Sequence, residues 1–213
     1  MSSLKKKNEM LIVFGGSFNP FSKAHGTLIN LLKRRFKEAQ IILLPSSDEF
    51  MIEKKHFQKA DILPLKARLN ILKIFEKRNK RVIIDLVEIN NPTFKTYDSL
   101  TYLKKKYQDK EIFFALGSEK LANLEKWYKI DELLKNFKFI VLKRGDEDFL
   151  TFNTSSDIYL KYSNSFVFFN YHAKLKNISS TKIRELINKD DYKDLNELTY
   201  QYVIKELLKI KKL

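Results

Sequence analysis

The feature that most constrains the fold of this chain is the alternation of short apolar runs with longer amphipathic stretches. Runs with the length and composition of buried strands cover residues 11–16, 39–46, 81–89, 111–118, 137–144 and 166–170. Amphipathic stretches with helical spacing lie between most of them, at residues 25–36, 63–78, 96–107 and 120–136. Because neighbouring parallel strands need a long crossover, this order predicts a parallel sheet with helices on both faces.

The sequence therefore predicts an α/β fold with a doubly wound, mostly parallel sheet of the Rossmann-like type. Further amphipathic stretches at residues 180–189 and 196–210 predict a small helical lobe at the C-terminus. We expect a single domain over residues 1–213, with the α/β core at 10–175 and the C-terminal helices at 176–213.

The composition indicates a folded protein without thiol chemistry. Hydrophobic residues make up 44% of the chain, which is ample for a packed interior, and the absence of cysteine excludes disulfides and cysteine nucleophiles. No apolar stretch approaches the length of a membrane span, and we expect a cytoplasmic protein. Residues 145–165 have no clean period, so the sequence leaves open whether they form a lid or a surface excursion.

The formal net charge of +15 raises the question of nucleic-acid binding, because clustered Lys and Arg neutralise phosphates. The cations here are mostly Lys, and they are spread over almost every expected helix instead of forming one stripe. We therefore expect no nucleic-acid partner and no membrane partner. An anionic small-molecule substrate is equally compatible with the charge.

Scarce residue types concentrate in the stretch GGSFNPFSKAH, residues 15–25. Gly15 and Gly16 follow the first expected strand, where a missing Cβ lets backbone N–H groups approach a phosphate or a base, although an ordinary turn also explains a lone Gly-Gly pair. We expect Ser22 to be the N-cap of the next helix, which places His25 in its first turn, where anions bind well. A histidine in this position is, by itself, more often structural than catalytic.

A second polar stretch, NISSTKIREL at residues 177–186, begins another helix. We expect Ser180 or Thr181 to be its N-cap. Lys182 and Arg184 then lie near a helix start, where the dipole favours acids. Hydroxyls, backbone N–H groups and a guanidinium directed at one point would form a phosphate-binding site. The alternative is that Arg184 pairs with an acid elsewhere.

A third polar stretch, residues 115–127, follows the fourth expected strand. Gly117 ends that strand and Glu119 opens the next helix. The Glu119 carboxylate could accept a hydrogen bond from a ribose hydroxyl or hold a metal through water, but an acid near a helix start also has a purely structural role. Trp127 is the one tryptophan of the chain; such a residue is usually core, although near a ligand it offers a flat stacking surface.

Together these stretches resemble the nicotinate and nicotinamide mononucleotide adenylyltransferases of the nucleotidylyltransferase superfamily. GGSFNPFSKAH is similar to the signature G-[ST]-F-[DN]-P-x-[HT]-x-x-H, and ISSTKIR (178–184) is similar to I-S-S-T-x-[IV]-R. The resemblance extends from Ile12 to about Leu208. Two residues depart from the family pattern, since Ser22 replaces the first histidine of the H-x-G-H form and Glu119 replaces an aspartate.

Weaker matches extend the resemblance to the part of the family that binds the mononucleotide. Lys55 lies where the family has a substrate-loop lysine, with Arg68 in the helix that follows. Thr96 is similar to a threonine at a helix start, and Arg144 ends a strand as the family's arginine does. The resemblance implies mononucleotide contacts for Lys55, Thr96, Trp127 and Arg144, with Trp127 stacked on the pyridine ring.

The resemblance also implies a set of residues around the phosphates. His25, Ser22 and Arg184 are implied as catalytic residues. The residues implied to bind ATP are Gly15, Gly16, Ser17, Phe18, His25, Gly117, Glu119, Ser179, Ser180, Thr181 and Arg184. No protein metal ligand is implied, because Mg²⁺ would be bound through phosphates and water.

The implied activity is adenylyl transfer from ATP to nicotinate mononucleotide, or to nicotinamide mononucleotide, with release of pyrophosphate in NAD biosynthesis. The sequence leaves the choice between the two mononucleotides open and is compatible with a homo-oligomer. The alternatives are an enzyme like phosphopantetheine adenylyltransferase, which shares both signatures, and a non-catalytic nucleotide- or RNA-binding module.

Overall fold

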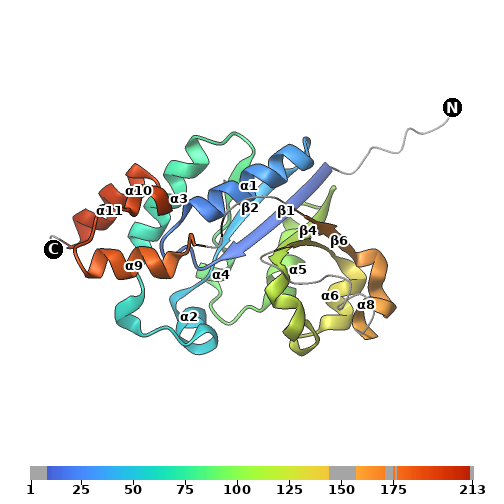
Figure 1. Ribbon diagram of the computed structural model, residues 1–213. Coiled ribbons are helices and arrows are strands. Elements are labelled where there is room, and N and C mark those ends of the chain that lie inside the picture. The colour runs from blue at the N-terminus through green and yellow to red at the C-terminus, as the bar shows by residue number, and fades with distance from the viewer. Residues whose placement is uncertain (1–8, 144–156, 171–174, 176, 212–213) are drawn as a thin grey trace.

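A six-stranded parallel sheet forms the centre of the molecule (Figure 1). The computed structural model describes residues 9–143, 157–170, 175 and 177–211. Across the sheet the strands follow the order β3-β2-β1-β4-β5-β6, and each neighbouring pair is parallel. The strands are β1 (Glu9–Gly16), β2 (Gln40–Pro45), β3 (Val82–Ile84), β4 (Lys110–Gly117), β5 (Lys138–Leu142) and β6 (Phe166–Phe169). The strand order reverses between β1 and β4, which confirms the predicted doubly wound sheet and makes their carboxyl ends the expected ligand site.

Two hydrophobic cores lie on opposite faces of the sheet, as the side chains of β1 show. Ile12 and Phe14 belong to one core, and Leu11 and Val13 belong to the other. The helices that contribute to the first core are α1 (Lys23–Arg35), α3 (Leu65–Lys77), α9 (Ser180–Asn188), α10 (Leu195–Leu198) and α11 (Gln201–Lys211). Those of the second are α4 (Val87–Asn90), α5 (Thr96–Lys106), the 3-10 helix η2 (Ser118–Lys126), α6 (Ile130–Asn136) and α8 (Asp157–Tyr162).

The C-terminal helices α9 to α11 pack on the same side of the sheet as α1 and α3 (Figure 1). This arrangement confirms the predicted helical C-terminus and brings the second motif next to the first. The remaining elements are α2 (Asp48–Lys55) and two short 3-10 turns, η1 (Lys59–Asp61) and η3 (Ser163–Ser165). None of the helices described here is long and apolar enough to cross a membrane.

Two expected elements differ in the structure, each for a local reason. The strand expected at 81–89 ends after Ile84, because the Asp85 carboxylate accepts a hydrogen bond from the backbone N–H of Val87 (3.0 Å) and begins α4. The helix expected at 120–136 is interrupted between η2 and α6, where Lys129 adopts a left-handed backbone conformation with φ of 52°. The sequence also gave no prediction of α2, an eight-residue helix without a clear amphipathic period.

Candidate active site

Both sequence motifs meet at one pocket of about 250 Å³ at the carboxyl end of β1. The lining comes from the loop after β1, the starts of α1 and α9, the end of α2, and η2. The lining residues are Gly15, Gly16, Ser17, Phe18, Asn19, His25, Lys55, Phe57, Lys120, Ser180, Thr181 and Arg184. Among these described residues Lys55, Lys120 and Arg184 are cationic and none is acidic, so the pocket is suited to an anion.

The loop after β1 has a strained conformation that packing holds in place. Phe18 is 1% exposed and has a φ of 45°, in the left-handed region that bulky residues rarely adopt. Its ring packs closely on the backbone of the preceding turn, since a Cβ added at Gly16 would lie 3.1 Å from it. A side chain at position 16 would therefore press on the ring, and glycine keeps the loop backbone open to the pocket.

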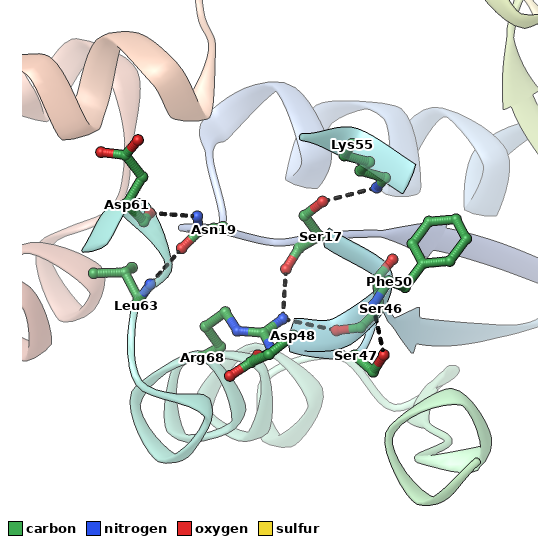
Figure 2. Close-up of polar contacts among 10 residues, drawn as sticks. All are labelled: Ser17, Asn19, Ser46, Ser47, Asp48, Phe50, Lys55, Asp61, Leu63 and Arg68. Carbon is green, nitrogen blue, oxygen red and sulfur yellow. Dashed lines mark hydrogen bonds and ion pairs between the residues drawn. The ribbon is translucent and has the colours of Figure 1, made fainter. Parts of the chain in front are cut away.

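A buried guanidinium fixes this loop to the end of β2 (Figure 2). Arg68 of α3 is 0% exposed, and its Nη1 donates hydrogen bonds to the backbone oxygens of Ser17 (2.9 Å) and Ser46 (3.0 Å). Its Nη2 pairs with the Asp48 carboxylate at the start of α2. Burial lowers the pKa of Arg68, and Asp48 opposes that shift. One side chain thus holds the turns that follow β1 and β2 in a fixed relation.

The side-chain amide of Asn19 anchors the other end of the loop (Figure 2). Asn19 is 1% exposed; its Nδ2 donates to the Asp61 carbonyl (2.8 Å), and its Oδ1 accepts from the Leu63 backbone N–H (2.9 Å). Both polar groups of the amide are therefore satisfied by the backbone of one segment. Asn19 also lines the pocket, although it was not among the residues predicted to bind a ligand.

The structure confirms Ser22 as the N-cap of α1 and shows how it orients His25. The backbone N–H of Ser22 donates to Nδ1 of His25 (3.0 Å), and the Ser22 hydroxyl lies 2.9 Å from the same nitrogen. Because Nδ1 accepts a backbone hydrogen bond, the ring proton of the neutral imidazole lies on Nε2. The ring also stacks on Phe21, with centroids 5.4 Å apart.

Ser22 itself is 1% exposed and does not appear in the described lining of the pocket. Its hydroxyl is within hydrogen-bonding distance of the His25 ring and backbone N–H. The geometry therefore fits a residue that positions His25 better than one that contacts a ligand.

The N-cap expected for α9 was wrong by one or two positions. Ser179, and not Ser180 or Thr181, is the N-cap, and its hydroxyl accepts from the Lys182 backbone N–H (3.1 Å). Ser180 makes a different contact, because its hydroxyl donates to the carbonyl of Pro20 in the first motif (2.7 Å). The two motifs are thus joined by a direct hydrogen bond at the pocket.

Arg184 makes a second connection between the motifs. Its Nη1 donates to the Asn19 carbonyl (2.6 Å), its Nη2 donates to the Thr181 hydroxyl (3.4 Å), and its guanidinium carbon lies 5.1 Å from the centre of the Phe57 ring. Burial lowers the pKa of Arg184, while Asp61 opposes that shift. The guanidinium is oriented by contacts with a carbonyl, a hydroxyl and an aromatic ring, and it lines the pocket.

Lys55 extends from the end of α2 to the loop, where its Nζ donates to the Ser17 hydroxyl (2.8 Å; Figure 2). The side chain is exposed as a whole, and it lines the pocket. Loss of hydration, followed by repulsion from Lys120, lowers the pKa of Lys55 to about 8, while Glu88 acts in the opposite direction. Burial raises the pKa of Glu88 to about 7, although the Ser99 hydroxyl donates to its carboxylate (3.0 Å).

Gly117 and Glu119 lie at the end of β4 and the start of η2 but are not among the described lining residues. A Cβ added at Gly117 would lie 2.1 Å from the Glu119 carboxylate, so this carboxylate lies directly over the glycine backbone. The part that these two residues play in ATP binding stays a prediction.

The residues predicted to bind the mononucleotide are only partly brought together. Thr96 begins α5 and Trp127 follows η2, and neither lines the described pocket; Arg144 is outside the described residues. Trp127 packs edge-on against Phe114, with ring centroids 6.1 Å apart, and the Phe114 ring would lie 3.5 Å from a Cβ at Gly15. The Phe114 ring therefore lies against Trp127 and also next to Gly15, which lines the pocket.

Phe57 and Lys120 also line the pocket, and neither was predicted to do so from the sequence. Phe57 follows α2 in an irregular segment that carries no motif. Lys120 had a detectable signal, because it follows the polar residues at the carboxyl end of the fourth expected strand. In a chain so rich in lysine, that signal was easily lost.

A comparison with known protein families identifies the class of protein to which the chain belongs. The chain matches the family described as "Cytidylyltransferase-like" over residues 13–186, a span that includes both motifs and most of the sheet. The chain belongs to this family of nucleotidyltransferase enzymes.

Curated relatives narrow the class to one group of enzymes. A protein of Acholeplasma laidlawii named "Probable nicotinate-nucleotide adenylyltransferase" is 30% identical over 90% of this chain and 94% of its own length. A protein of the same name from Endomicrobium trichonymphae is 32% identical over 90% of this chain and 94% of its own. The predicted resemblance to the nicotinate mononucleotide adenylyltransferases is confirmed.

Solved structures of low sequence identity to this chain confirm the fold. A nicotinic acid mononucleotide adenylyltransferase of Plasmodium falciparum, solved in complex with NaAD, has a TM-score of 0.76 at 19% identity, covering 95% of this chain and 96% of its own. The same enzyme in complex with APC has a TM-score of 0.75. At this identity the likeness shows the nucleotidylyltransferase fold.

Proposed function

We propose that the protein transfers the adenylyl group of ATP to nicotinate mononucleotide, releasing pyrophosphate in NAD biosynthesis. The observation that carries this proposal is the pocket in which both motifs meet, with two helix starts and three cationic side chains around it. Two curated relatives that align with 90% of the chain are named for this activity.

The proposed reaction is an in-line displacement at the α-phosphorus of ATP. A phosphate oxygen of the mononucleotide forms the new P–O bond, and the bond between the α-phosphorus and the oxygen bridging to the β-phosphate breaks. That oxygen leaves with the pyrophosphate. Since the attacking phosphate is already anionic near neutral pH, positioning and charge neutralisation supply the catalysis, and no strong general base is needed.

The first motif would supply donors to the phosphates next to the reacting centre. The Nε2–H of His25 is the side-chain donor, because Ser22 occupies Nδ1. The backbone N–H groups after β1 are the second source, and the Arg68 and Asn19 contacts hold their loop in place before any ligand binds. Such preorganised donors stabilise charge that develops in the transition state without further reorganisation.

The second motif would bind the departing pyrophosphate. The start of α9 lines a pocket whose described lining has no acid, and there the Arg184 guanidinium donates to the Thr181 hydroxyl. Ser180 keeps this helix start against the Pro20 carbonyl, so the two halves of the site stay in register.

Bound with ATP, Mg²⁺ would supply positive charge that neutralises part of the charge on the phosphates. No group of three or more acidic or histidine side chains suited to holding a metal ion occurs among the described residues. We expect phosphate oxygens and water to hold the cation, because Mg²⁺ commonly keeps several waters in such sites.

A substrate panel tests the proposal. The purified protein is incubated with ATP and Mg²⁺ together with nicotinate mononucleotide, nicotinamide mononucleotide or phosphopantetheine, and pyrophosphate release and product mass are measured. We expect a dinucleotide of nicotinate and adenine to form fastest. Product only with phosphopantetheine, or nucleotide binding without pyrophosphate release, would contradict the proposal.

A further inference from the structure

Lys120 is a pocket-lining cation that neither motif includes. It lies in η2, the 3-10 helix that begins directly after β4, and its side chain is exposed. Lys55 reaches the same pocket from α2 and donates to the Ser17 hydroxyl. The two lysines therefore come from opposite sides of the strand-order reversal and share one cavity with the loop after β1.

The two lysines line one pocket, and their like charges repel each other. Lys120 is the second-largest cause of the lowered pKa of Lys55, after loss of hydration, and Arg68 adds to the repulsion. Glu88 compensates only in part, because burial keeps its own pKa near 7. No acid lines the described pocket, so these positive charges are poorly balanced in the unliganded protein. A polyphosphate bound there would relieve the repulsion.

We propose that Lys120 is a further phosphate-binding residue, which together with Lys55 binds the phosphate groups of a nucleotide in this pocket. The proposal rests on the proposed function for the identity of the nucleotide, but not for the class of ligand, which is a polyphosphate anion. Each lysine offers a point charge with three donors and therefore suits phosphate oxygens of varied geometry.

Anion binding at this pair has a consequence for protons. Lys55, with a pKa of about 8, is only partly protonated at pH 8, and an adjacent polyphosphate raises that pKa. Binding at pH 8 should therefore take up as much as about half a proton at Lys55. The charged or titratable groups that affect Lys55 or share its pocket are Lys120, Arg68, Glu88, His25 and Arg184. Lys120 is exposed and lies on η2, so its replacement removes the repulsion between Lys55 and Lys120 and leaves the other groups in place.

Isothermal titration calorimetry with inorganic triphosphate tests the proposal. Binding is measured at pH 8 in two buffers of different ionisation enthalpy, which gives both the affinity and the protons taken up. The wild-type protein is compared with Lys120→Gln and with the control Lys126→Gln, an exposed lysine of the same helix that does not line the described pocket.

We expect Lys120→Gln to weaken triphosphate binding by about tenfold, the effect of losing one charge-assisted hydrogen bond, and to reduce the proton uptake. Lys126→Gln should match the wild type. Equal affinity of the two variants would overturn the proposal, as would weaker binding by Lys120→Gln with unchanged proton uptake. Failure of the wild type to make a dinucleotide would refute the proposed function and leave this binding result standing.

Discussion

Replacement of Arg68 by Met should destabilise the protein and loosen the loop that follows β1. The substitution leaves the carbonyls of Ser17 and Ser46 without their donor, at a cost of about 1–3 kcal/mol each. Asp48 loses less, because its side chain is 42% exposed and water can replace the guanidinium. Removal of the buried Nε, which has no hydrogen-bond partner among the described residues, returns about 1–3 kcal/mol. With the middle of each range, the net loss is about 2 kcal/mol.

Urea unfolding followed by circular dichroism measures this loss directly. For a chain of this length it corresponds to a fall in Tm of about 2–4 °C per kcal/mol. Asp48→Asn is the matched control, since it keeps Arg68 and its two carbonyl contacts and should cost less than Arg68→Met. An unchanged or higher unfolding free energy for Arg68→Met would refute the reasoning, because the buried guanidinium would then contribute nothing to the loop.

Three further substitutions test other parts of the structure. Gly26→Ala should cost about 1–3 kcal/mol in thermal unfolding, because the new Cβ would lie 1.9 Å from the Tyr200 hydroxyl oxygen, and Tyr200→Phe should recover part of that loss. Ser22→Ala should cost about 1 kcal/mol of stability through the lost cap, and Ser22→Thr should retain most of it. Glu88→Gln should stabilise the protein by about 1–3 kcal/mol at pH 8 and by nothing at pH 4. Burial raises the pKa of this carboxyl from 4.5 to about 7, so the cost of its charge appears as the pH rises through that window.

The sheet could be predicted from the sequence because its strands are short continuous apolar runs separated by helical periods. The ends of elements were less predictable, since single side chains decide them. Asp85 stops β3 by bonding to the Val87 N–H, and Lys129 interrupts a helical pattern through a left-handed backbone. Neither residue type predicts the end of a strand or a helix from sequence, because Asp and Lys are common in both helices and loops.

The meeting of the two motifs at one pocket was predictable because each motif is compact and has an unusual local composition. The contacts that support it were not, since Arg68 lies about fifty residues from Ser17 and reaches it only through the fold. Lys120 is one lysine among many in the sequence, and only the end of β4 brings it into the pocket. Long-range placement of this kind depends on strand order and side-chain direction, which local patterns do not encode.

We propose that adenylyl transfer takes place in the pocket that His25 lines. The most direct test is steady-state turnover of ATP and nicotinate mononucleotide by His25→Ala, with the control His56→Asn, a histidine at the end of α2 that is not among the described lining residues. We predict a loss of about 10²–10³ in kcat for His25→Ala, with unfolding still cooperative, and turnover near the wild-type value for His56→Asn. A His25→Ala protein that keeps a tenth or more of the wild-type kcat would contradict the account.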